Sequence, residues 1–170
     1  MAAGSLLLIS VLPVNRKKDV MEGAWRLRRR VLPQHTDHAG VMWHGAYLAW
    51  LEEARVEALQ QVGLAYSDLS ARGLELPVVS LAIDYRAALL HGDQVELLSR
   101  VECRSGLRLP WLSQFIGPGG AVAAEARVEL VLVELSASGA QRRLMRRFPA
   151  DLAAAIARLN AGPEGAELGL

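Results

Sequence analysis

The sequence lacks the features that define several classes of protein. Its single cysteine, Cys103, excludes a disulfide framework and fits a reducing compartment, so we expect a cytoplasmic protein. No CxxC pair or zinc-finger spacing occurs. The formal net charge of +1 argues against a general nucleic-acid binder. The longest early apolar run, residues 6–14, is interrupted by Pro13 and is far shorter than a bilayer requires, so no membrane span is predicted.

The composition favours one globular domain with weakly patterned ends. Hydrophobic residues make up 52% of the 170, which excludes general disorder and allows a sizeable core. A secretory signal needs positive charge before its apolar segment, whereas the charges at residues 16–18 follow it. We therefore interpret residues 1–22 as a disordered leader, with a targeting role as the open alternative. Residues 23–160 form the expected domain, and residues 161–170 a disordered tail.

Hydrophobic periodicity predicts one long helix among several strands. Apolar residues recur at spacings of three and four from Gly45 to Val62, and Gly63 can end the helix. A short helix is expected from Tyr66 to Arg72, and another after Pro149 as far as Leu159. Period-two patterns predict strands at 25–31, 78–87, 94–103, 108–116, 121–135 and 142–148. Pro110 suggests a bulge or a sheet edge in its strand. This order indicates an α+β fold in which the long helix covers the sheet.

Asp37 is the main candidate for chemistry. It begins an Asp-x-x-Gly turn that leads, through Val41 to Trp43, into the start of the long helix. The first N–H groups of a helix have no partner within it and carry a partial positive charge. A carboxylate base beside such donors can hydrolyse an acyl group, because the base activates the attacker and the N–H groups hold the oxyanion. The alternative is that Asp37 only caps its own turn.

This segment also carries a family signature. The pattern D-x-x-G-x-x-x-H-x-x-Y-L-x-x-x-E-x-A-R is matched by Asp37, Gly40, His44, Tyr47, Leu48, Glu52, Ala54 and Arg55. A weaker match follows in Leu76-Pro77-Val78-Val79, Ile83-Asp84-Tyr85 and Gly92-Asp93. The chain resembles the hotdog-fold acyl-CoA thioesterases, in particular the 4-hydroxybenzoyl-CoA thioesterase type and its bacterial short-chain acyl-CoA relatives.

The resemblance implies a fold and an assembly. It predicts the hotdog fold, an antiparallel sheet of five to six strands wrapped around one long helix. It also implies that two protomers join their sheets edge to edge, with the active sites at that interface. We therefore expect a homodimer or a homotetramer, with acyl-CoA as substrate and with no metal or redox cofactor.

Within the resemblance, Asp37 acts as general base or as a nucleophile that forms a mixed anhydride. The helix start at His44 and Gly45 supplies the oxyanion donors, and the His44 imidazole is a candidate to orient Asp37. Gly45 gives the backbone room to approach substrate. Trp43 and Tyr47 are expected to line the acyl pocket.

Coenzyme A also requires cations for its phosphates. Arg104, Ser105 and Arg108 lie in the turn where the family contacts the nucleotide, although an ordinary solvated hairpin explains them equally well. Arg86 and the arginines at 142–147 are weaker candidates.

Other interpretations remain open. The group of His35, Asp37, His38 and His44 resembles a zinc set, but its spacing is not that of an established helical site and no thiolate is near. Glu52 and Arg55 are expected to form a structural i,i+3 pair, with Glu52 as a second polar group of the site as the alternative. The alternative functions are a 1,4-dihydroxy-2-naphthoyl-CoA hydrolase of quinone biosynthesis and a non-catalytic module that binds acyl-CoA or acyl-carrier protein. Asp37 argues against a mere binder, which has no use for a base.

Overall fold

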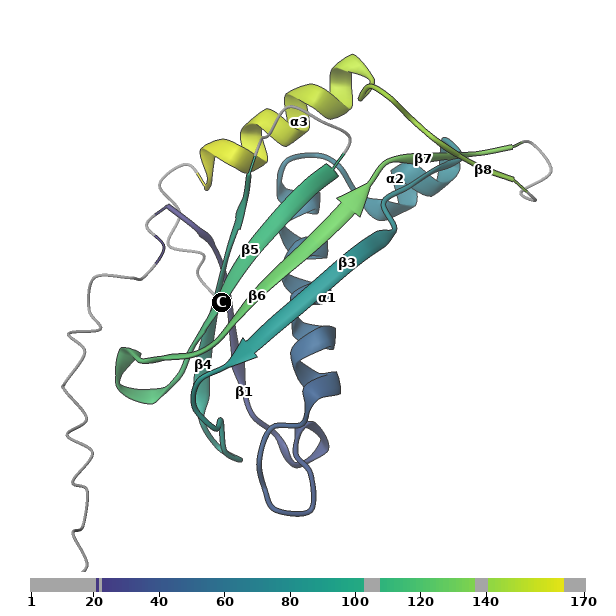
Figure 1. The fold of residues 1–170 in the computed structure, drawn as a ribbon. Helices are drawn as coiled ribbons and strands as arrows, with labels where there is room; N and C mark the ends of the chain where they lie inside the picture. The colour runs from purple at the N-terminus through teal and green to yellow at the C-terminus, as the bar shows by residue number, and fades with distance from the viewer. Residues whose placement is uncertain (1–20, 22, 103–107, 137–140, 164–170) are drawn as a thin grey trace, which may run out of the picture.

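A five-stranded antiparallel sheet covered by one long helix forms the body of the protein (Figure 1). The structure is a computed structural model that describes residues 21, 23–102, 108–136 and 141–163. The strands lie in the order β1 (Trp25–Arg30), β4 (Gln94–Val101), β5 (Arg108–Ile116), β6 (Val122–Val131) and β3 (Val78–Tyr85). The predicted hotdog arrangement is confirmed. The expected leader, apart from Met21, and residues 164–170 of the expected tail lie outside the described residues.

Helix α1 (His44–Gln61) packs along the inner face of this sheet. Its buried side chains recur every three or four residues: Ala46, Tyr47, Trp50, Leu51, Ala54, Arg55, Ala58 and Leu59. They meet inward-facing residues of the central strands, among them Leu97 of β4 and Phe115 of β5. Gly63 follows the helix with φ +77, a left-handed conformation that favours glycine at a helix end.

One inward position of β1 is an arginine, and its partner lies on α1. The Arg29 guanidinium pairs with Glu53, and its Nε donates to both carboxylate oxygens at 3.1 Å. The hydrogen bond that Arg29 donates to Glu53 raises the pKa of Arg29 above its ordinary value. This ion pair explains how a charge can interrupt the apolar face of the strand.

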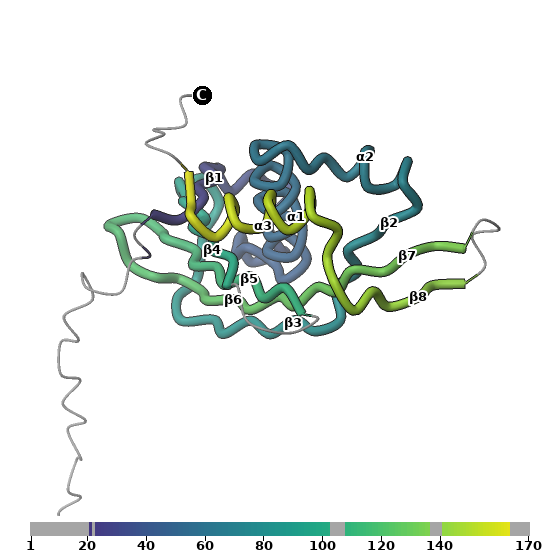
Figure 2. The backbone as a smooth tube through the Cα atoms, turned by 90° about the horizontal axis from the view of Figure 1, so that it is seen from above, coloured from purple at the N-terminus to yellow at the C-terminus, as the bar shows by residue number. Residues whose placement is uncertain are grey.

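The last part of the chain departs from the predicted strands. The long strand expected at 121–135 divides at Leu132 into β6 and β7 (Val133–Leu135). Strand β7 lies between β2 (Leu74–Glu75), which was not predicted, and β8 (Arg142–Leu144), which is shorter than expected. Figure 2 shows this small sheet extending to one side of the main sheet, with α2 (Tyr66–Ala71) beside it and α3 (Ala150–Ala161) above β4 and α1.

The prediction for Pro110 was wrong, because β5 is a central strand and the irregularity between β5 and β6 lies at Phe115 and Ile116 instead. The Pro110 carbonyl accepts the Glu102 N–H at 3.0 Å. The nitrogen of Pro110, which carries no hydrogen, therefore faces β4 at the point where the ladder between β4 and β5 ends, at Val101. Proline is tolerated there because few ladder bonds remain to be lost.

Strand β3 forms an edge of the main sheet and carries several exposed apolar side chains. They are Val78, Val79, Leu81 and Tyr85. An apolar edge with unpaired backbone groups is a site for pairing with another chain. Among the described residues, no helix has both the length and the apolar character to cross a membrane.

Candidate active site

The Asp37 turn is held by its own backbone and by its aspartate. The Asp37 N–H donates to the Val41 carbonyl at 2.9 Å, and Gly40 adopts φ +75, which favours glycine. Oδ1 of Asp37 accepts the N–H groups of Ala39 at 2.8 Å and Val41 at 3.1 Å. Within the described part of the chain, Oδ2 has no hydrogen-bond partner. One carboxylate oxygen therefore fixes the turn, and the other remains accessible for chemistry.

The segment after the turn is anchored to the residues that follow β3. Met42 donates its N–H to the Leu89 carbonyl at 2.8 Å, and His91 donates to the Gly40 carbonyl at 3.1 Å. The Trp43 N–H donates to the His35 carbonyl at 3.1 Å. These bonds hold Asp37 in a constant position relative to the start of α1.

Helix α1 begins without a side-chain cap. Trp43 occupies the N-cap position, its side chain makes no capping hydrogen bond, and the first turn holds no acidic residue. Among the described residues, no acceptor bonds the N–H groups of His44 or Gly45. Most helix starts have such donors satisfied by Ser, Thr, Asp or Asn. Here they are available to an anion, at the positive end of the helix dipole.

Asp37 and the helix start share one pocket of about 920 Å³. Its other lining residues include Thr36, Met42, Trp43, Tyr47, Tyr85 and Arg86. The Tyr47 ring packs edge-on between two others, with ring centres 5.0 Å from Tyr85 and 4.8 Å from Phe115. Burial, with a smaller contribution from Tyr85, raises the pKa of Tyr47 to about 12. Its hydroxyl therefore stays neutral at physiological pH.

Two members of this pocket, Tyr85 and Arg86, were not predicted to line it together with Asp37, although Arg86 was a weaker candidate for the phosphates of coenzyme A. Tyr85 stands in the second matched stretch, Ile83-Asp84-Tyr85, which was a signal for it. Arg86, which follows directly, pairs with Glu125 on β6. Their approach to Asp37 depends on where β3 ends, which no local pattern indicates.

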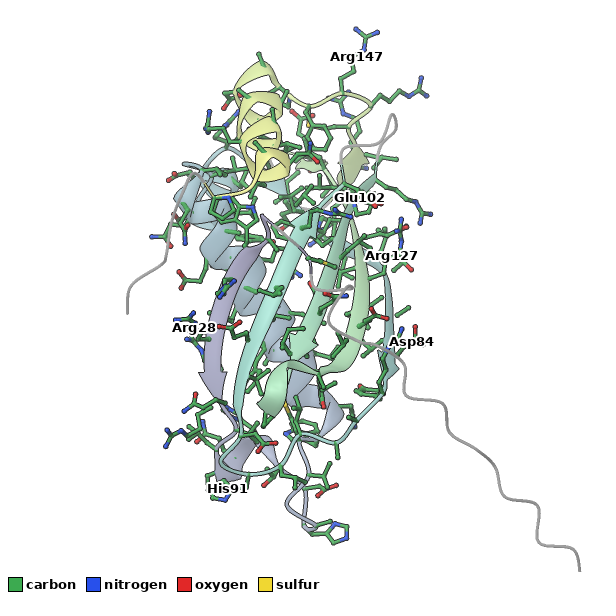
Figure 3. The ribbon with its side chains drawn as sticks, turned by 90° about the vertical axis from the view of Figure 1, so that its left-hand side faces the viewer. Arg28, Asp84, His91, Glu102, Arg127 and Arg147 are labelled. Carbon is green, nitrogen blue, oxygen red and sulfur yellow. The ribbon has the colours of Figure 1, made fainter. Side chains whose placement is uncertain are left out.

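Of the predicted phosphate-binding residues, Arg108 lies in the described part of the chain, and it does not line this pocket. Arg104 and Ser105 lie outside the described residues. Arg108 opens β5 at the end opposite Phe115 and forms an ion pair with Glu129. Figure 3 shows the nearby Arg127 and Glu102, a pair with an N···O distance of 3.6 Å, far from His91 beside the Asp37 turn.

The histidines near Asp37 are separated in space. Nδ1 of His35 accepts the Leu32 N–H at 3.1 Å, and its ring meets Trp50 at 5.2 Å between centres. The His44 ring meets the Trp43 ring edge-on, with 5.1 Å between centres. The described residues contain no group of three side chains placed to hold a metal ion.

The expected Glu52–Arg55 pair was wrong. Arg55 is buried, and its Nε donates to the Tyr66 hydroxyl at 3.3 Å. Glu52 is exposed and forms no ion pair with Arg55. Arg55 faces α2, and its tertiary contact there outweighs an i,i+3 ion pair, which is worth only a few tenths of a kcal/mol.

A comparison with known families agrees with the fold. The family model described as the thioesterase-like superfamily matches residues 31–156. The chain belongs to this superfamily. The predicted thioester-hydrolase class is thereby supported, and the general resemblance found in the sequence is confirmed at this level.

Individual relatives support the assignment to this superfamily. The sll0410 protein of Synechocystis sp. (strain PCC 6803), whose name proposes esterase activity, is 37% identical over 131 residues, which cover 76% of each chain. The acyl-CoA thioester hydrolase YbgC of Escherichia coli O6:H1 is 27% identical over 62% of this chain and 78% of its own. The structure of a DHNA-CoA thioesterase from Staphylococcus aureus superposes with a TM-score of 0.69 at 25% identity, covering 78% of this chain and 87% of that chain.

Proposed function

We propose that this superfamily member hydrolyses acyl-CoA thioesters to the free acid and coenzyme A, without a metal or redox cofactor. One observation carries the proposal: the Asp37 carboxylate and an uncapped helix N-terminus line the same pocket. A base and a set of oxyanion donors are the two groups that acyl transfer to water requires. The names of relatives such as YbgC agree with this activity.

In the general-base route, Oδ2 of Asp37 takes a proton from water, and the water oxygen attacks the thioester carbon. The carbonyl oxygen becomes an oxyanion, which the N–H groups of His44 and Gly45 stabilise. Collapse of the tetrahedral intermediate breaks the C–S bond, and the thiolate leaves and takes up a proton. In the nucleophilic route, Oδ2 attacks first and the thiolate leaves. Water then hydrolyses the mixed anhydride.

The proposal extends to a homodimer, or a pair of dimers, assembled through β3. The exposed apolar side chains of this edge support it. Two edge strands related by a two-fold axis run antiparallel, so the Tyr85 end of one strand lies beside the Val78 end of the other. The Arg108 end of the partner's sheet then lies closer to the pocket than Arg108 of the same protomer. This arrangement is compatible with a nucleotide-binding role for Arg108.

The lining of the pocket bears on the acyl group of the substrate. Trp43, Tyr47 and Tyr85 give the pocket an aromatic lining, which favours flat aromatic acyl groups. Two candidates follow, 4-hydroxybenzoyl-CoA and 1,4-dihydroxy-2-naphthoyl-CoA, and the likeness to the DHNA-CoA thioesterase supports the second.

The test is a thiol-release assay of purified protein against a panel of aromatic, short-chain and long-chain acyl-CoAs. We expect catalytic release from at least one aromatic acyl-CoA. Tight binding of acyl-CoA with no release from any member would overturn the proposal in favour of a binding module.

A further inference from the structure

Gly45, the second residue of α1, has no room for a side chain. A Cβ built on it would lie 2.1, 2.3 and 2.7 Å from three carbons of the Trp43 six-membered ring, Cη2, Cζ3 and Cζ2. No non-bonded carbon atoms approach so closely, so the indole fills the space that a side chain at position 45 would take. The backbone of Gly45 does not have a positive φ, so it imposes no other requirement for glycine.

The indole reaches this position because Trp43 caps the helix with an extended backbone, φ −82 and ψ 153. Its ring lies over the first turn and meets the His44 imidazole edge-on, with 5.1 Å between centres. Trp43 and His44 line the pocket, whereas Gly45 does not. The wall of the pocket in front of Gly45 is therefore the indole itself.

We infer that Trp43 determines acyl specificity, and that Gly45 acts as the seat that holds its indole against the helix start. The inference rests on the proposed function. With the indole seated, the acyl group beside the oxyanion donors meets a flat aromatic wall, which suits planar acyl groups. Without the seat, the wall is lost and the pocket widens, which suits flexible aliphatic chains.

The competing explanation is that position 45 must be glycine because the substrate itself occupies the space that a side chain there would take. The two explanations differ in what Gly45→Ala does when the indole is absent. If Gly45 acts as a seat, the substitution matters only while Trp43 is present. If the substrate fills that space, an added methyl group interferes in either background. Alanine is a better helix former than glycine, so the variant is expected to fold.

The experiment combines Gly45→Ala, Trp43→Ala and the double variant with two substrates, benzoyl-CoA and octanoyl-CoA. Loss of an aromatic contact weakens recognition of the benzoyl group by about 2- to 12-fold. We expect the benzoyl-to-octanoyl ratio of kcat/KM to fall by this amount in both single variants, and to fall no further in the double variant. An equal effect of Gly45→Ala with and without Trp43 would overturn the seat, and an unchanged ratio in Trp43→Ala would overturn the specificity role.

A second readout needs no activity. Trp43 is 44% exposed, whereas Trp25, Trp50 and Trp111 are 7%, 3% and 2% exposed, so acrylamide quenches Trp43 selectively among the four tryptophans. Gly45→Ala should increase quenching, and Trp43→Phe should remove the quenchable component and serve as the control. Unchanged quenching in Gly45→Ala would overturn the seat.

If the wild-type protein hydrolysed no acyl-CoA, the proposed function would fail by itself. The same four proteins would then be compared by equilibrium binding of the two acyl-CoAs, with the same predicted change in their ratio. Absence of that change would overturn the inference separately.

Discussion

Asp37 has a structural role and a proposed chemical role in one carboxylate. Oδ1 accepts two backbone N–H groups of its own turn, as expected for an aspartate near glycine, while Oδ2 faces the pocket without a partner among the described residues. The two interpretations of Asp37 in the sequence are therefore compatible. A substitution has to preserve the first role in order to test the second.

Asp37→Asn meets this condition, because its amide oxygen can still accept the N–H groups of Ala39 and Val41. We expect kcat to fall by about 10²–10⁴-fold, the usual contribution of a general base, while acyl-CoA still binds. Thiol release and equilibrium binding measure the two effects. Asp68→Asn removes an exposed carboxylate from α2 and is the matched control. Full turnover in Asp37→Asn would eliminate this mechanism.

Tyr47 gives a prediction for alkaline pH. Its pKa is raised to about 12 by burial, whereas an unfolded tyrosine ionises near about 10. Between these values the unfolded state releases a proton that the folded state retains, so stability is complete below the lower value and declines as pH rises toward the upper one. Denaturant midpoints measured across this range should fall less in Tyr47→Phe. Parallel decline in both proteins would contradict the assignment.

At the scale of elements, the uncapped start of α1 is the decisive feature. A Ser or Asp at position 43 would stabilise the helix by about 1 kcal/mol, but its side chain would occupy the donors that an oxyanion needs. The helix instead obtains its stability from a long buried face against β4 and β5. Packing energy therefore leaves the first-turn N–H groups available for function.

His44→Ala and His44→Pro separate the side chain from the backbone at this position. Both remove the imidazole, but only proline removes the N–H. Trp43 already has the extended backbone that a residue before proline adopts, so the proline variant is compatible with the fold. We expect proline to lower kcat by a further 10²–10³-fold or so relative to alanine. Circular dichroism verifies folding first, and equal rates would place the oxyanion hole elsewhere.

At the scale of the whole molecule, the main sheet has one well-covered side and one apolar edge. Strand β1 carries exposed arginines, two of which pair with Glu96, and such charge discourages strand addition. Strand β3 instead exposes Val78, Val79 and Leu81. The contrast between the two edges is what favours assembly through β3.

Leu81→Lys should therefore dissociate the assembly, because it places a charge in the middle of the proposed interface, and it should also reduce activity. Light scattering and thiol release measure the two effects. Ala157→Lys adds the same charge to an exposed position of α3 and should change neither. A wild-type protein that is fully active as a monomer would refute the dimeric site.

The sequence alone was sufficient to predict the features that depend on local patterns. Periodicity placed α1 within one residue at each end, and it located the main strands, because buried faces repeat every three to four residues in helices and every two in strands. The motif around Asp37 likewise predicted a turn followed by a helix start, since both depend on residues close together in the chain.

Only the tertiary structure decided the features that depend on distant partners. These include the division of the strand at Leu132 to form a second sheet, the central position of the strand with Pro110, and the pairing of Arg55 with Tyr66. The position of Tyr85 in the pocket of Asp37, and that of the Trp43 indole over Gly45, also depend on distant partners. Their common physical reason is that the favourable contact is made with a surface supplied by the fold, whose position no short segment of sequence can specify.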